Sequence, residues 1–168
     1  FMIRVGSLTD LKNLDQGGID QKSGMTAAEQ LTAIYDAVRP LYKKREEIFH
    51  EVDSQLRVHG IYQLRYEELE APEVKDLKQY FKNSMAPLLS PQIVDTHHPF
   101  PHLENKVLHV GALLQRRNKE VFGVIPVPSA LPDVIFLPGS ELRCVRTAEV
   151  LLEYLADIFT AYTVEEST

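Results

Sequence analysis

Three histidines lie within six positions of the sequence, at His97, His98 and His102, in the stretch DTHHPFPHLENK that spans residues 95–106. Imidazole nitrogens bind zinc and can carry a phosphoryl group, so this stretch is the first candidate for chemistry. Its prolines hold the backbone extended, and adjacent side chains on extended backbone point in opposite directions. At most two of the histidines can then converge, and no carboxylate lies at a spacing that completes a zinc site. We therefore interpret the stretch as a rigid connector whose histidines bond to backbone or water, and we predict no metal site.

Other sequence patterns that carry chemistry are absent. The sequence contains no GXXXXGK phosphate loop, no GXGXXG after a predicted strand and no GXSXG nucleophile motif. Its acidic pairs are direct neighbours, so their side chains should splay into water; they are Glu46–Glu47, Glu67–Glu68 and Glu165–Glu166. We predict no catalytic residue in this chain.

The sequence has one cysteine, Cys144, which excludes an internal disulfide and a cysteine zinc site. The neighbouring Arg143 and Arg146 could lower the pKa of its thiol, but no base is near it in the sequence. We interpret Cys144 as an inert structural residue. A lone thiol and the lack of a secretory signal peptide predict a cytoplasmic protein.

The charge of the chain limits its partners. Its 168 residues carry a net charge of −6, and the tight basic runs are confined to residues 43–45 and 116–117. Nucleic acids and other polyanions need clustered lysine and arginine, so we predict that the chain alone binds neither. No run of eighteen apolar residues occurs, which predicts no membrane span.

The first sixty residues show the periodicity of helices. The opening stretch FMIRVGSL places its apolar residues on one helical face, and residues 13–24 predict an exposed connector. Thr26 and Glu29 form a capping box that should begin a second helix. Apolar residues then recur every three or four positions towards Gly60, which predicts a helix of about 30 residues and about 45 Å in a bundle or hairpin. Pro40 should kink that helix near its middle.

Beyond residue 60 the patterns alternate between strands and helices. We expect strands at residues 61–66, 106–115, 121–128, 133–138 and 142–146, and helices at 69–85 and 147–162. The fold class predicted is α+β: a long-helix bundle or hairpin over residues 1–60, then a mixed α/β region with a small sheet over residues 61–168. Neither end of the sequence closes an obvious element, which favours a piece of a longer protein.

The order of several stretches resembles the bacterial polyphosphate kinases that make long-chain polyphosphate from ATP. The most specific stretches are HPFPHLENK, followed by a buried strand, and VPSALPDVIFLPG; GMTAAEQL, HGIYQLRYEEL and TAEVLLEYLADIFTAY occur in the matching order. The resemblance covers nearly the whole chain. It implies that residues 1–60 are the later helices of an N-terminal helical domain, and that residues 61–168 are the first part of a head domain. Pro40 departs from the usual family helix.

The resemblance also implies a reaction and where its parts lie. The family enzyme transfers the γ-phosphoryl group of ATP to a histidine and then to a growing polyphosphate chain. That histidine, its arginines and its magnesium contacts belong to two C-terminal domains related to phospholipase D. The resemblance therefore implies no cofactor in this chain, ATP and magnesium for the parent enzyme, and polyphosphate contacts only through those domains. It places Phe1 and Arg4 near the nucleotide, and it makes His98 of the HPFP motif part of the head scaffold.

The role implied for this chain is scaffolding and dimerisation, without activity of its own. Its partners would be the remaining domains of the parent enzyme and a second copy in a homo-oligomer. The parent would be cytoplasmic or peripherally associated with a membrane. The alternative is an independent interaction module without enzymatic role, in which a helical hairpin on a small α/β unit binds a protein partner.

Overall fold

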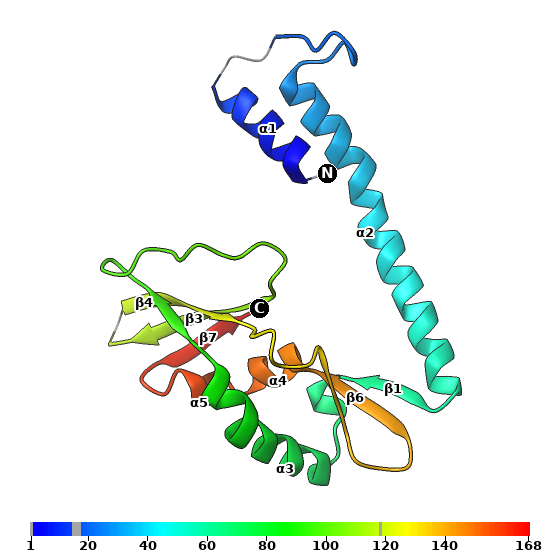
Figure 1. Ribbon diagram of the computed structural model, residues 1–168, viewed down its shortest axis with the longest axis vertical. Coiled ribbons are helices and arrows are strands. Elements are labelled where there is room, and N and C mark those ends of the chain that lie inside the picture. Colours follow the sequence, from blue (N-terminus) through cyan, green and yellow to red (C-terminus); the bar gives the residue numbers. More distant parts are fainter. Residues whose placement is uncertain (1, 15–17, 118) are drawn as a thin grey trace. The chain divides into compact units, whose positions relative to one another are not determined.

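The computed structural model describes residues 2–14, 18–117 and 119–168. Contacts between Cα atoms divide the chain into a helical unit, Phe1–Gln55, and a sheet unit, Leu56–Thr168. A long helix followed by a region with two small sheets confirms the predicted α+β class (Figure 1). The domain boundary placed after residue 60 stays a prediction. Within the described ranges, no helix combines the length and apolar character that crossing a membrane requires.

The helical unit contains α1 (Met2–Asn13) and most of α2 (Ala27–Val58). The predicted capping box begins α2: the Thr26 N–H donates to Glu29 Oε2 at 2.8 Å, and the Glu29 N–H donates to Thr26 Oγ1 at 3.3 Å. The α-helix is continuous through Pro40, and the kink there stays a prediction. Its small core joins α1 to the first turns of α2 and consists of Leu8, Ala27 and Leu31, with Val5 and Ile34 packed against them.

The sheet unit contains two sheets. The first has the strand order β1-β6-β5, formed by β1 (Ile61–Leu64), β6 (Leu142–Arg146) and β5 (Val134–Phe136); β1 and β6 are parallel. The second is antiparallel with the order β2-β4-β3-β7, formed by β2 (Gln92–Val94), β4 (Lys119–Pro126), β3 (His109–Arg116) and β7 (Thr163–Ser167). The predicted β3–β4 hairpin is confirmed, whereas β2 and β7 were not predicted.

Short helices connect and cover these sheets. They are a 3-10 turn at Tyr66–Glu68, α3 (Ala71–Tyr80), a π-helical turn at Phe81–Met85, a 3-10 turn at Ala86–Leu88, α4 (Thr147–Glu153) and α5 (Leu155–Ile158). The core that they share with the sheets includes Leu77, Met85, Leu114, Ile125, Val145 and Leu151, each at most 2% exposed.

The continuous helix predicted over residues 147–162 is wrong. It breaks at Tyr154, whose φ of −95° and ψ of 19° lie outside the helical region. Tyr154 Oη lies 2.8 Å from Tyr66 Oη, and its ring stacks on Phe81 with a centroid distance of 4.5 Å. Tyr154 and Phe159 are each 5% exposed, so tertiary packing of these two rings overrides the helical pattern of the sequence.

Candidate functional site

The histidine stretch folds around the carboxylate of its own first residue, Asp95. Asp95 Oδ1 accepts the N–H groups of His97 and His98, each at 2.8 Å, and lies 2.9 Å from His98 Nδ1. The hydrogen bond from the His97 N–H, followed by those from the His98 ring and N–H, lowers the pKa of Asp95 to about 2. Asp95 thus orders the backbone of the turn and holds the His98 ring by hydrogen bonds. The turn curls the chain back, which strictly extended backbone would not do.

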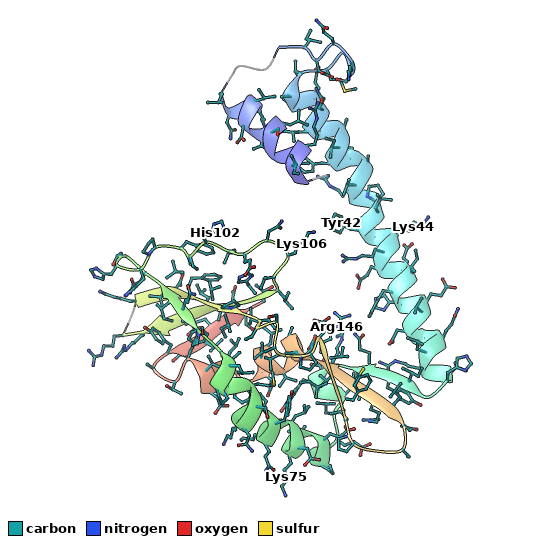
Figure 2. All side chains as sticks on the ribbon, in the orientation of Figure 1. Tyr42, Lys44, Lys75, His102, Lys106 and Arg146 are labelled. Carbon is teal, nitrogen blue, oxygen red and sulfur yellow. The ribbon has the colours of Figure 1, made fainter. Side chains whose placement is uncertain are left out.

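The structure does not bring the three histidines together. His102 lies further along the connection between β2 and β3 (Figure 2), beside a cavity of about 180 Å³ that His109 also lines. The ring of His109 is held by its own backbone, since Nδ1 lies 2.9 Å from the Val107 carbonyl oxygen. Across residues 2–14, 18–117 and 119–168, no group of three or more His, Cys, Asp or Glu side chains could hold a metal ion.

The predicted nucleotide-proximal residues lie at the start of the helical unit. Phe1 is outside the described residues. Arg4 lies on α1, and its Nη2 donates to Gln30 Oε1 at 2.7 Å; Gln30 Nε2 in turn donates to the Met25 carbonyl oxygen at 3.2 Å. The Arg4 guanidinium thus ties α1 to the beginning of α2. A role for Arg4 towards a nucleotide stays a prediction.

Cys144 is buried on β6, and burial raises the pKa of its thiol. The neighbouring arginines have other partners. Arg143 Nε donates to Glu73 Oε1 at 2.6 Å, and Gln63, with its amide oxygen towards Arg146, accepts from that guanidinium at 2.8 and 2.9 Å. These contacts support the interpretation of Cys144 as a structural residue.

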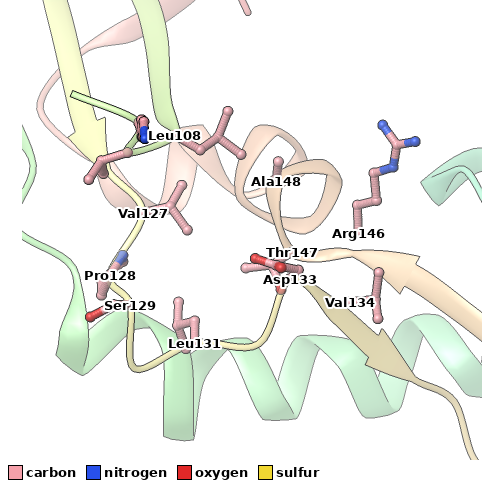
Figure 3. Close-up of a pocket in the computed structure, with 12 residues that line it drawn as sticks. Leu108, Val127, Pro128, Ser129, Leu131, Asp133, Val134, Arg146, Thr147 and Ala148 are labelled. Carbon is pink, nitrogen blue, oxygen red and sulfur yellow. The ribbon is translucent and has the colours of Figure 1, made fainter. Parts of the chain in front are cut away.

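A cleft of about 490 Å³ opens beside the junction of β6 and α4 (Figure 3). Its apolar wall comes from the segments that enter β3 and leave β4, at Leu108 and Val127, and from Leu131. Asp133 and Thr147 lie side by side at its centre, and the Arg146 side chain extends away from them. This mixture of apolar surface and a few polar groups is typical of a small-molecule site, although it does not select a ligand.

The hydroxyl and N–H groups of Thr147 in this cleft form hydrogen bonds within the protein. The Thr147 hydroxyl donates to the Pro132 carbonyl oxygen, and the Thr147 N–H donates to the Asp133 carbonyl oxygen at 3.0 Å. These bonds fix the start of α4 against the segment before β5. Among the described lining residues, none forms the hydrogen-bonded pair of nucleophile and base that acyl or phosphoryl transfer through the protein would need. The sequence could not reveal the cleft, because its walls come from three separate segments.

The fold and these sites define a class: an α+β protein with a helical unit and a two-sheet unit, in which Arg4, Arg143 and Arg146 bond to side chains of the chain itself. Comparison with known families identifies the family that has this architecture. Residues 73–168 match the sequence model described as the polyphosphate kinase middle domain, and residues 1–64 match that of the polyphosphate kinase N-terminal domain. Because the middle-domain match alone covers more than half of the chain, the chain belongs to the polyphosphate kinase family.

Individual relatives agree with this assignment. A polyphosphate kinase of Erythrobacter litoralis is 31% identical over 96% of this chain and 22% of its own length, and one of Bacillus cereus is 29% identical over 100% of this chain and 25% of its own. The crystal structure of a polyphosphate kinase from Porphyromonas gingivalis superimposes with a TM-score of 0.79 at 17% identity, over 99% of this chain and 25% of that one. The resemblance found in the sequence is confirmed, and the chain spans about a quarter of the length of these relatives.

Proposed function

We propose that this chain is the N-terminal and middle-domain scaffold of an enzyme that transfers the γ-phosphoryl group of ATP, through a phosphohistidine, to polyphosphate. The observation that carries the proposal is the pair of family matches, which together span residues 1–64 and 73–168. The relatives carry the name polyphosphate kinase and are about four times as long as the part matched here. The reacting histidine, ATP and magnesium would then be held by the other domains.

The electrostatics of the chain support a scaffold without activity of its own. Phosphoryl transfer needs concentrated positive charge around the phosphate oxygens, whereas this chain carries a net charge of −6. Arg4 and Arg143, two of its cations, are bonded to Gln30 and Glu73. His98 is held by Asp95 on an exposed turn. Polyphosphate would reach this part only together with the other domains.

The test compares two proteins in one assay. The longer polypeptide that contains this segment and the 168-residue chain alone are each incubated with ATP and magnesium, and polyphosphate is measured by gel electrophoresis with a phosphate-labelled nucleotide. We expect long-chain polyphosphate from the longer protein and none from the chain alone, with heat-treated enzyme as the blank. Synthesis by the chain alone, or undiminished synthesis by the longer protein after deletion of residues 61–168, would contradict the proposal.

A second candidate function is an independent interaction module. The observation that favours it is the exposed apolar surface of α2, where Leu41 and Tyr42 are each 59% exposed. Such a module would bind its partner equally well whether or not the other domains are present. In a scaffold, the same surface serves contacts within the parent enzyme, including contacts between its subunits.

A further inference from the structure

β5 lies at one edge of the first sheet. In the order β1-β6-β5 it has β6 on one side, and no described strand pairs with its other side. The Leu137 N–H donates to the Arg143 carbonyl oxygen at 2.9 Å, and the Thr147 N–H donates to the Asp133 carbonyl oxygen at 3.0 Å. These two bonds close the β5–β6 pair at its ends and determine which backbone groups of β5 face β6.

The register leaves the other backbone groups of β5 directed outward. Hydrogen-bonded and non-hydrogen-bonded positions alternate along an antiparallel pair. Ile135 is therefore the residue of β5 that bonds to β6, whereas the N–H and C=O groups of Val134 and Phe136 point away from it. Such an edge can pair with a further strand.

An apolar pocket of about 430 Å³ lies between α3 and this edge. Ile135 is on the face of the sheet that packs on α3, the same face from which Arg143 reaches α3. Leu77 and Tyr80 of α3 form the opposite wall. Among the described residues that line the pocket, Asp76 alone carries a charge. The pocket thus suits an apolar side chain with a cation close to it.

The other face of the edge is apolar as well. Phe136 is 62% exposed there, and Leu142 of β6, on the same face, is 49% exposed. Open edges in native proteins usually carry charged side chains, and β5 carries none. Pro132 and Pro138 flank the strand and limit pairing beyond it, so the edge accepts one short strand.

We propose that a strand from the part of the parent polypeptide outside residues 1–168 pairs with β5 in the complete enzyme. Its backbone bonds to the outward N–H and C=O groups of Val134 and Phe136. One of its large apolar side chains enters the pocket beside α3, and a lysine or arginine on the same face pairs with Asp76. This inference rests on the proposed function, because it needs the longer polypeptide.

The shortness of β5 favours a tethered partner over a separate one. Val134 and Phe136 offer two N–H and two C=O groups, and each hydrogen bond contributes little on balance because it replaces a bond to water. A free peptide or a second chain would also lose translational and rotational freedom on binding. A segment of the same polypeptide avoids most of that loss, since its effective concentration is high. The relatives are about four times as long as the part matched here, so the parent has such segments to supply.

Hydrogen exchange tests this pairing. The probe is a peptic fragment that covers residues 132–138 and reports the amides of residues 134–137, since Pro132 and Pro138 have none. In the 168-residue chain alone, we expect the two amides that bond to β6, those of Ile135 and Leu137, to exchange slowly. In the longer polypeptide all four amides should exchange slowly.

Variants separate pairing from a general effect on the fold. Val134→Pro removes one outward donor, and an edge strand tolerates proline where the N–H does not bond within the sheet. In the longer polypeptide it should make the Phe136 amide exchange at least about tenfold faster, while the Ile135 and Leu137 amides stay slow and show that the sheet is intact. Val134→Ala keeps the donor and is the matched control, so its four amides should stay slow.

The charge at the pocket is tested in the same way. Asp76→Lys should also speed the exchange of the Val134 and Phe136 amides in the longer polypeptide, because it places a cation beside the cation of the added strand. Asp157→Lys makes the same charge change on α5 and should leave these amides slow.

Cross-linking identifies the partner. A photoreactive benzophenone amino acid in place of Phe136, in a mixture of isotope-labelled and unlabelled longer polypeptide, should link to a residue outside 1–168 of the same chain. A link to a second copy, or only two slow amides in the longer polypeptide, would overturn the inference. Polyphosphate synthesis is measured on the same preparation. Synthesis with only two slow amides would leave the proposed function standing without this inference, and four slow amides without synthesis would do the reverse.

Discussion

The ion pair between Glu73 and Arg143 joins α3 to β6 inside the sheet unit. Arg143 Nε donates to Glu73 Oε1 at 2.6 Å and Nη2 donates to Glu73 Oε2 at 3.0 Å, in the bidentate geometry that gives the strongest such pairs. Glu73 Oε2 also accepts the Glu70 N–H at 2.8 Å, which caps α3. The substitution Glu73→Ala removes all three hydrogen bonds at once and leaves the guanidinium with Glu70, 4.0 Å away.

The expected cost follows from burial. The Glu73 and Arg143 side chains are 9% and 19% exposed, so the arginine left behind would be a largely desolvated charge. Removing one partner of a buried pair costs about 3–5 kcal/mol, and the nearby Glu70 carboxylate favours the lower end of that range. We expect Glu73→Ala to lower the free energy of unfolding of the sheet unit by about 3 kcal/mol, or its melting temperature by roughly 10 °C.

The stability that the Glu73–Arg143 ion pair contributes should decrease as the pH falls. The hydrogen bond from Arg143 lowers the pKa of Glu73 below its ordinary value of 4.5. Because the folded pKa is lower than the unfolded one, this stabilisation is complete above about pH 4.5 and is lost as the pH falls through the folded pKa. The Glu73→Ala variant should therefore lose less of its stability in acid than the parent chain does.

Urea unfolding between pH 3 and pH 7, followed by near-ultraviolet circular dichroism of the buried tyrosines, measures both effects. The control is the double substitution Glu73→Leu with Arg143→Met, which removes both charges and should recover most of the stability. The burial argument would be refuted if Glu73→Ala lowered the free energy of unfolding by less than about 1 kcal/mol at pH 7. It would also be refuted if the loss of stability between pH 7 and pH 3 were the same in the variant as in the parent chain.

Three further predictions concern other parts of the chain. Gly123→Ala places a Cβ 2.7 Å from Leu114 Cδ1 and 2.8 Å from Phe159 Cζ, and should lower the free energy of unfolding by about 1–3 kcal/mol in the same urea titration. The thiol of Cys144, whose pKa is raised by burial, should stay unreactive towards an aromatic disulfide at pH 8 until urea unfolds the chain. Thr26→Ala removes the capping hydroxyl of α2 and should cost about 1 kcal/mol, measured as reduced thermal stability of the helical circular dichroism signal.

Each of these predictions has a matched control. Gly6→Ala adds a Cβ that meets nothing within 4 Å, so it should be neutral or slightly stabilising in α1. Ser23→Cys adds an exposed thiol that should react at once. Thr32→Ala removes only a hydrogen bond to the Ala28 carbonyl oxygen within α2. If Gly123→Ala or Thr26→Ala were as stable as its control, the close contact or the cap would contribute nothing to stability. If Cys144 reacted as fast as the thiol of Ser23→Cys, burial would not protect it.

The parts of the fold that local chemistry determines were predictable from the sequence. The reciprocal bonds of Thr26 and Glu29 need only a spacing of three residues, and they begin α2 as expected. The apolar run of β3 is buried at Val110, Ala112 and Leu114, and it forms the expected hairpin with β4. In these cases the deciding partners lie close together in the sequence.

The parts that distant partners determine were not predictable. β7 has the sequence TVEES, with little apolar character, and it is a strand because it pairs with the edge of β3 between Ala112 and Gln115. β2 has three residues and pairs with β4 in the same way. Tyr154 sits in an unbroken helical pattern, but the helix breaks there, where the Tyr154 hydroxyl lies 2.8 Å from that of Tyr66, 88 residues away. Propensity is weaker than such packing.

The same distinction between local and distant partners applies to the candidate sites. The contact between Asp95 and His98 could have been found, because an aspartate three residues before a histidine can accept both backbone and ring N–H groups in a turn. The cleft beside Thr147 could not be found, since its walls come from three separate segments, 106–108, 127–134 and 146–148, that only the two sheets bring together. Residue spacing in the sequence therefore predicts sites whose residues are close in the chain, but not sites that the topology of the fold assembles from distant segments.

The partners of the arginines are the strongest physical reason to regard this chain as a scaffold. A guanidinium that binds a phosphate must be able to leave its present partner. If Arg143 turned towards a phosphate, the Glu73 carboxylate would remain buried and unpaired, at a cost of about 3–5 kcal/mol. An exposed ion pair with a phosphate would return about 1 kcal/mol or less. The exchange is unfavourable by several kcal/mol, so an arginine with this burial holds α3 on β6 and does not turn towards a phosphate.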